Sequence, residues 1–249
     1  MKKVLIAGES WMSYTTHVKG FDTFYTSVYE EGIEFIRTAL EKAGYEVDFM
    51  PNHLAPTNFP FTMEELKEYD CVVLSDIGSN TLLLPPDTFS KSICRPNRCQ
   101  LIKEYVEQGG AFLMVGGYMS FSGIDAKARY GQTAIQEILP VQCLDIDDRA
   151  EHLEGVVPVN VSNHEAIKNL PEKWPAFLGY NKTKATPQGE VLVTICGDPL
   201  IAVGSFGKGK SAVFTSDCAP HWGPPEFVHW EYYNELWKGL MDYLTSKTE

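Results

Sequence analysis

Short apolar runs alternate with helix-like segments through the first half of the chain. Between the runs, apolar residues recur at spacings of three and four, as on one face of a helix, from Val28 to Ala43 and from Leu101 to Val106. Thr62 and Glu65 have the spacing of a capping box and predict a further short helix. The runs themselves are typical of strands buried on both faces of a sheet: Lys3–Gly8, Tyr45–Met50, Cys71–Leu74 and Ala111–Val115. This order of strands and helices predicts a doubly wound, mostly parallel sheet with helices on both faces.

The segment Gly109–Gly123, which reads GGAFLMVGGYMSFSG, is the expected centre of this sheet. Five apolar residues between two glycine pairs are typical of a buried strand with a tight turn at each end. The second pair, Gly116 and Gly117, allows a tight turn at the carboxyl end of the strand, where open α/β sheets bind their ligands. Glu9 and Asp76 follow two of the other strands, so we expect them at the same edge.

Residues 11–27 carry many aromatic and hydroxyl side chains but no clear periodicity. A loop so rich in rings is typical either of a lid over a binding site or of a contact with another subunit. The sequence favours neither interpretation over the other.

The second half of the chain predicts further strands. We expect short helices over Gln132–Leu139 and His164–Leu170, a strand over Val156–Val161 and a closing helix over Glu231–Leu244. Three β-rich runs predict a C-terminal β-hairpin or meander: Val191–Ile195, Leu200–Phe206 and Ser211–Thr215. With no linker and no repeat, the chain is expected to form one α/β, flavodoxin-like domain over residues 1–249.

The acidic composition restricts the classes of partner. The chain has 21 Lys and Arg residues against 33 Asp and Glu, a formal net charge of -12, and no basic cluster. Nucleic acid and anionic membranes are therefore not expected as partners, because binding to phosphate depends on clustered cations. The run after Lys3 is too short for a signal peptide, and no apolar stretch is long enough to span a bilayer. These features predict a cytoplasmic protein.

Metal ligands are not indicated, and we expect no metal and no cofactor. Six cysteines without an export signal favour reduced thiols. The one close pair, Cys94 and Cys99, lacks two further ligands at zinc-site spacing. An acidic stretch could hold a divalent cation, but we interpret it as a solvated loop: Asp145, Asp147, Asp148 and Glu151.

One motif match is misleading. Residues 204–211 read GSFGKGKS and satisfy the phosphate-loop formula. That loop works because a helix follows it and directs its N-terminus at the phosphates. Here Ser211 is followed by a short β-branched and apolar run that predicts a strand, so we interpret the glycines and lysines as a hairpin turn.

His221 is the best single candidate for function, because it lies just past a predicted buried strand, in a loop that contains prolines, Trp222 and two nearby carboxylates, Asp217 and Glu226. Such a histidine suits general base catalysis or ligand binding. The alternative is a histidine that only holds the loop together by hydrogen bonds.

Together with the central segment, the run GKGKSAVFTSDCAPHWG at residues 207–223 resembles the class I glutamine amidotransferase-like superfamily, in its branch named "putative glutamine amidotransferase". The resemblance covers nearly the whole chain and includes the aromatic last helix. It implies a cysteine nucleophile on the turn after the central strand, a histidine after a late strand, and a glutamate two residues beyond it.

The chain departs from this pattern at two of the three positions. His221 matches the histidine, but Gly223 stands where the glutamate is expected, and Glu226 is the nearest carboxylate. The turn offers Gly116, Gly117 and Tyr118 and no cysteine. Because glutamine hydrolysis of this class needs a thiolate to form its thioester, that activity is not expected here.

Three functional hypotheses remain open. In the first, the protein has no hydrolytic chemistry and binds a small polar metabolite or sugar at the carboxyl edge of the sheet, beside His221 and with these candidate ligand-binding residues: Glu9, Asp76, Gly116, Gly117, Tyr118 and Trp222. In the second, it is a hydrolase or transferase that uses His221 as base, with Glu226 nearby and with Ser120 or a water molecule as nucleophile. In the third, the aromatic segment at residues 11–25 makes the chain a structural subunit of a homo-oligomer.

Overall fold

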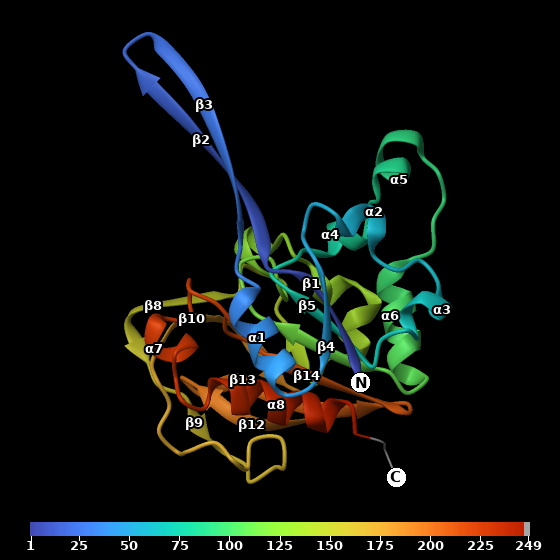
Figure 1. The fold of residues 1–249 in the computed structure, drawn as a ribbon, viewed down its shortest axis with the longest axis vertical. Helices are drawn as coiled ribbons and strands as arrows, with labels where there is room; N and C mark the ends of the chain where they lie inside the picture. Colours follow the sequence, from blue (N-terminus) through green and yellow to red (C-terminus); the bar gives the residue numbers. More distant parts are fainter. Residues whose placement is uncertain (247–249) are drawn as a thin grey trace.

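A computed structural model describes residues 1–246 and contains one large mixed sheet with helices on both faces (Figure 1). The sheet has eight strands in the order β4-β1-β5-β6-β14-β13-β12-β9. The five strands from β4 to β14 are parallel to one another, and the remaining three pair antiparallel. Their bounds are β1 Lys3–Gly8, β4 Glu46–Met50, β5 Cys71–Ser75, β6 Ala111–Val115, β9 Val159–Asn160, β12 Gly189–Ile195, β13 Asp198–Phe206 and β14 Gly209–Phe214.

The two faces of the sheet have separate apolar cores, because alternate residues of each strand point to opposite sides. Val73 and Leu113 belong to the core that includes side chains of α1 (Glu34–Lys42) and α8 (Tyr233–Leu244). Val72 belongs to the other core, which α6 (Arg98–Glu107) helps to form. This double cover explains why the parallel strands are continuously apolar in sequence.

The remaining elements are short or lie outside the main sheet. The other helices are α2 Ala55–Asn58, α3 Met63–Leu66, α4 Ser79–Leu83, α5 Pro86–Lys91, η1 Ile124–Ala126, η2 Tyr130–Gln132, η3 Ala134–Ile138 and α7 Pro225–Val228. The other strands form three two-stranded sheets: β7 Val141–Cys143 with β11 Thr183–Ala185, β8 Arg149–Val156 with β10 Phe177–Asn181, and β2 Ser10–Lys19 with β3 Asp22–Glu31. None of the helices in residues 1–246 is both long and apolar enough to cross a membrane.

The pattern-based prediction of the main sheet is confirmed. β6 lies between β5 and β14, in the middle of the sheet, and the predicted capping box is formed by Thr62 and Glu65. Residues 207 and 208 form the turn between the antiparallel strands β13 and β14. Ser211 therefore lies within a strand, which confirms that the GSFGKGKS segment is not a phosphate loop.

The prediction of a loop over residues 11–27 was wrong. This segment forms most of a long antiparallel ribbon, β2 and β3, that projects away from the body of the molecule (Figure 1). Its threonine, valine, tyrosine and phenylalanine residues have high strand propensity. Since the ribbon is exposed on both faces, however, it lacks the apolar-polar alternation by which strands are recognised. Val28 belongs to β3, and the helix expected from that residue begins only at Glu34.

Three predictions in the middle of the chain need correction. The helix expected over Gln132–Leu139 is a 3-10 helix from Ala134 to Ile138. The strand expected over Val156–Val161 is divided between the end of β8 and the two-residue β9. The segment His164–Leu170 forms turns and no helix, although the Ser162 hydroxyl accepts the backbone N–H of His164 as a cap would.

We predict that Gly117→Ala destabilises the fold by about 2–4 kcal/mol. Gly117 has a φ of +144°, and a Cβ there would lie 2.7 Å from Asp76 Oδ1. Gly44→Ala is the matched control, because Gly44 has a φ of +90° but nothing within 4 Å of its Cβ position. That control should lose only about 1 kcal/mol. Urea unfolding measures both changes, and equal losses would show that close packing at the turn is unimportant.

Candidate functional site

A cavity of about 400 Å³ lies at the carboxyl edge of the parallel strands. Glu9 follows β1, Asp76 follows β5, Tyr118 follows β6, and Asp217 and His221 follow β14. These residues line the cavity together with Trp11, Ala219 and Pro220. The expectation that this edge gathers the polar strand ends is confirmed, and the Tyr118 and His221 rings meet edge to face at 4.4 Å.

Glu9 and Asp76 enter the cavity from strained backbone positions. Their φ angles are +46° and +47°, in the left-handed region that residues other than glycine rarely adopt. The Glu9 N–H donates to the carbonyl of Ser75, and Met119 N–H donates to Asp76 Oδ1 at 2.6 Å. Strain of this kind persists only where the surrounding structure enforces it, and it is concentrated at functional sites.

Burial of these acids in one place perturbs their ionisation. The Glu9 side chain is 3% exposed, and burial, followed by the charges of Asp217 and Asp76, raises its pKa well above the usual range. Burial and then the Asp217 charge raise the pKa of Asp76 to about 6, against the opposing effects of the Met119 N–H and of His221. The cavity therefore holds more acidic groups than it can keep ionised at low cost.

His221 is paired with a carboxylate. Its Nδ1 lies 3.3 Å from Asp217 Oδ2, and its side chain is 40% exposed. Burial alone would lower the pKa of His221, but the hydrogen bond to Asp217 and the charge of that residue outweigh it, and the pKa is raised. An aspartate at Nδ1 orients the ring and leaves Nε2 available for a ligand or a proton.

A second carboxylate fixes the aromatic side of the site. Glu151 accepts hydrogen bonds from the Tyr118 hydroxyl at 3.0 Å and from Trp222 Nε1 at 2.9 Å. The Arg149 guanidinium lies over the Tyr118 ring at 4.8 Å, and Trp222 stacks on His221 at 5.2 Å. Trp222 is buried and is not among the residues that line the cavity, so its contact with the site passes through Tyr118 and His221.

The acidic stretch from Asp145 to Glu151 is only in part the solvated loop that the sequence indicated. Asp148 is buried, accepts the backbone N–H groups of Ser122 and Gly123, and accepts a hydrogen bond from Asn181. Asn181 in turn bonds both the N–H and the carbonyl of Gly117. Asp148 therefore fixes the turn after β6 through backbone contacts that no sequence pattern indicates.

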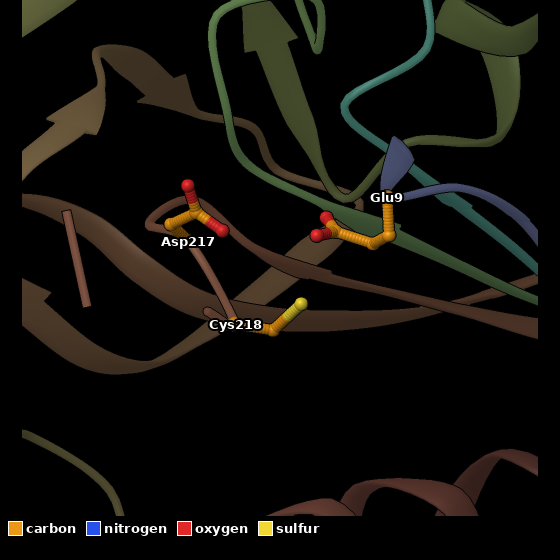
Figure 2. A group of neighbouring side chains, drawn as sticks. All are labelled: Glu9, Asp217 and Cys218. Carbon is orange, nitrogen blue, oxygen red and sulfur yellow. The ribbon is translucent and has the colours of Figure 1, made fainter. Parts of the chain in front are cut away.

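Glu9, Asp217 and Cys218 form a buried cluster beside the cavity (Figure 2). One ligand atom from each lies within 4.8 Å of the others, and Figure 2 shows the Glu9 carboxylate extending toward Asp217 with the Cys218 sulfur directed toward Glu9. Two carboxylates and a thiolate are donors that suit a divalent cation such as zinc. The Cys218 side chain is fully buried. Without a metal, burial and then the charge of Glu9 raise the pKa of its thiol well above the usual range.

Three predicted site residues have other surroundings. Ser120 is buried, its hydroxyl donates to the Val115 carbonyl and accepts the Asp76 N–H, and it does not line the cavity. Gly116 packs so closely that a Cβ would lie 2.3 Å from the Thr215 carbonyl oxygen. Glu226 is exposed in the first turn of α7 and also lies outside the cavity lining.

Two contributors were missed by sequence reasoning. Trp11 lines the cavity from the base of β2, where its Nε1 donates to Glu30 at 3.0 Å. Glu151 reaches the site from β8. A signal existed for Trp11, since it stands two residues beyond Glu9, but none pointed from Glu151 to residues 118 and 222.

Comparisons with known proteins agree with the fold. The profile of the family described as "putative glutamine amidotransferase" matches residues 3–246. Cytoplasmic protein STM3548 from Salmonella typhimurium is similar with 45% identity and a TM-score of 0.94, over 97% of this chain and 98% of that one. Cytoplasmic protein STM1381 from Salmonella typhimurium LT2 has 46% identity and a TM-score of 0.94, over 99% and 100%. A ThuA-like protein from Bacteroides uniformis shares the fold alone, with 15% identity and a TM-score of 0.58 over 100% and 93% of the two chains. No match was found among curated proteins.

We predict that Asp76→Asn raises the free energy of unfolding at about pH 7.5 by about 2 kcal/mol, since the folded-state pKa of about 6 exceeds the unfolded value of about 3.9. A carboxyl with a raised pKa stabilises the fold below its unfolded pKa and loses that contribution as pH rises through about 6. The gain should therefore fall to about a third of that value at about pH 4.5 and disappear only below about pH 3.9, as urea unfolding across this range would show. Glu226→Gln removes the same charge from an exposed position and should change little. A less stable Asn variant at the higher pH would contradict the prediction.

Proposed function

The chain belongs to the "putative glutamine amidotransferase" family, and we propose that it is a member without the cysteine-dependent reaction, which binds a small polyhydroxylated ligand of sugar size in the cavity at the carboxyl edge of the sheet. The observation that carries this proposal is the lining of one cavity by three carboxylates, a histidine and two aromatic rings. The carboxylates are those of Glu9, Asp76 and Asp217.

This lining suits a ligand with many hydroxyl groups. Carboxylate oxygens accept hydrogen bonds from hydroxyl donors, and such charge-assisted bonds are among the stronger ones in proteins. Trp11 and Tyr118 supply flat apolar surfaces against which the C–H face of a sugar ring can pack. The volume of about 400 Å³ lies in the ordinary range for small-molecule sites.

The same lining disfavours anionic ligands. No lysine or arginine lines the described cavity, so a ligand carboxylate would face three acidic side chains with only His221, already paired with Asp217, to offset its charge. The turn after β6 offers no thiol, and Cys218 is fully buried with a raised pKa. Both features argue against the thioester chemistry of cysteine-dependent glutaminases.

A second function, hydrolysis or group transfer with His221 as general base, is favoured by the Asp217–His221 pair. Asp217 holds Nδ1, so that Nε2 can take a proton from a water molecule positioned in the cavity. Water is the nucleophile in this version, since the Ser120 hydroxyl is engaged by the Val115 carbonyl and the Asp76 N–H.

Two wider features accompany the proposal. The strand order β4-β1-β5-β6-β14 supports a flavodoxin-like arrangement within one domain, in which ligands bind at the carboxyl edge. The descriptions of the two Salmonella relatives as cytoplasmic proteins support the same location for this chain.

Isothermal titration with matched sugars tests the binding proposal. Neutral sugars and polyols should bind, whereas the corresponding uronates should bind at least about tenfold more weakly, because one uncompensated charge contact is worth about 1.4 kcal/mol or more. Asp217→Asn should weaken binding of the neutral ligand by a similar factor, and Glu226→Gln should leave it unchanged. Each titration is repeated with EDTA and with added zinc, since Glu9, Asp217 and Cys218 could hold a cation. Preferential binding of the uronates would overturn the proposal.

His221→Gln separates binding from catalysis. If His221 is a general base, the variant should lose turnover of ester, amide or glycoside substrates by about 100-fold or more while ligand affinity changes little. Because the pKa of His221 is raised, wild-type turnover should rise with pH and level off above the ordinary histidine pKa. Asp217→Asn should shift this rise in turnover to lower pH, because Asp217 raises the pKa of His221. Absence of turnover in the wild type across all three substrate classes would exclude the hydrolytic version and leave the binding proposal standing.

A further inference from the structure

The β2–β3 ribbon is a separate two-stranded sheet with a continuous register. Ten residue pairs run from Ser10↔Glu31 at the base to Lys19↔Asp22 at the tip, without a bulge. Beyond its base, where the Tyr29 ring meets His53 edge to face at 5.0 Å, the ribbon extends away from the body (Figure 1). All ten residues of β3 are exposed, and Phe21 at the tip is fully exposed.

The two faces of the ribbon differ in charge. Because paired residues share a face and neighbours along a strand alternate, one face carries Lys19, Asp22 and Glu30. On the opposite face, which we call the uncharged face, the only charge is Glu31 at the base. The large side chains of the uncharged face are Met12, Tyr14, Val18, Tyr25 and Tyr29, and all five are exposed.

Such a ribbon is not expected to persist uncovered. An isolated two-stranded hairpin is marginally stable in water. A contiguous exposed apolar patch on a soluble chain is typical of an interaction surface. Tyrosine is also one of the residues enriched where proteins meet.

We propose that the uncharged face docks on the uncharged face of a second copy of this chain, with the two ribbons antiparallel. A two-fold interface requires a surface that is complementary to itself, and a ribbon face that is rich in apolar and tyrosine side chains and has no charge along its middle meets that requirement. Face-to-face packing of two such sheets is the ordinary arrangement of β-sandwiches, with layers about 10 Å apart.

Charge favours this geometry over contact between the bodies of the two copies. Each chain carries a formal charge of -12, so acidic bodies in direct contact would repel each other. Antiparallel ribbons of ten residues hold the bodies roughly 30 Å apart, well beyond the Debye length of about 8 Å at physiological salt. The two copies then touch through their ribbons, and their acidic bodies stay apart.

The buried area is sufficient for a reversible dimer. Tyr14 and Tyr25 are largely exposed and contribute about 150 Å² each when covered, and with the smaller exposed areas of Tyr29, Met12 and Val18 the two copies together bury at most about 1,000 Å². That is the lower limit for a specific interface. We therefore expect a dimer that dissociates on dilution in the micromolar range.

Sedimentation velocity of the full chain over about 1–200 µM tests the proposal. The wild type should shift from one chain to two with increasing concentration. The double variant Tyr14→Glu with Tyr25→Glu, on the uncharged face, should weaken dimerisation at least about 100-fold, since it places charges in an apolar contact. Thr15→Glu with Val28→Glu is the matched control, because it adds the same charge to the opposite face of the same ribbon. This control should remain a dimer.

Three outcomes would overturn the proposal. These are a wild type that stays monomeric throughout the range, equal dissociation of both double variants, and a dimer that neither variant disturbs. Circular dichroism checks that the variants fold. If the Tyr14 and Tyr25 variant does not fold, hydrogen exchange of the wild type decides: ribbon amides should be protected at high concentration and should lose that protection on dilution. Concentration-independent exchange would count against the dimer.

Discussion

The close approach of backbone segments after β6 is the constraint on which the site depends. Gly116 lies against the backbone after β14, and Gly117 lies against Asp76 after β5, with no room for a side chain at either position. Asn181 fixes Gly117 through two hydrogen bonds and is itself held by the buried Asp148. Only because these segments meet without side chains between them can the carboxyl ends of four parallel strands border one cavity of about 400 Å³.

Because these strand ends meet at one cavity, acidic side chains are buried close to one another there. Glu9 and Asp76 have positive φ angles, and their pKa values are raised first by burial and then by the charge of Asp217. Natural sequences keep such destabilising arrangements mainly where function requires them. A ligand whose hydroxyl groups donate to these carboxylates would replace the water that burial removed, and it would stabilise the fold by binding the native state alone.

The sequence predicted those parts of the molecule whose burial follows a simple pattern. The runs around Val72 and Leu113 are covered on both faces, so their apolar character was sufficient to place the sheet, its central strand and the edge shared by Tyr118 and His221. The ribbon was missed because its residues are exposed on both sides and no burial pattern marks them. The contacts of Glu151 and the hydrogen bond from the Asp76 N–H to the Ser120 hydroxyl were missed for another reason, since they join segments far apart in the sequence.

Trp11 belongs to two structures at once: it is part of the cavity wall and the second residue of β2. Its indole is tied to Glu30 on the opposite strand, so the wall cannot shift without the ribbon base shifting as well. A ligand that displaced this ring would therefore change the free energy of any contact that the ribbon makes, and by thermodynamic reciprocity such a contact would change the affinity of the cavity by the same factor. Under the two proposals, occupancy of the cavity and assembly through the ribbon would thus be coupled through one indole ring.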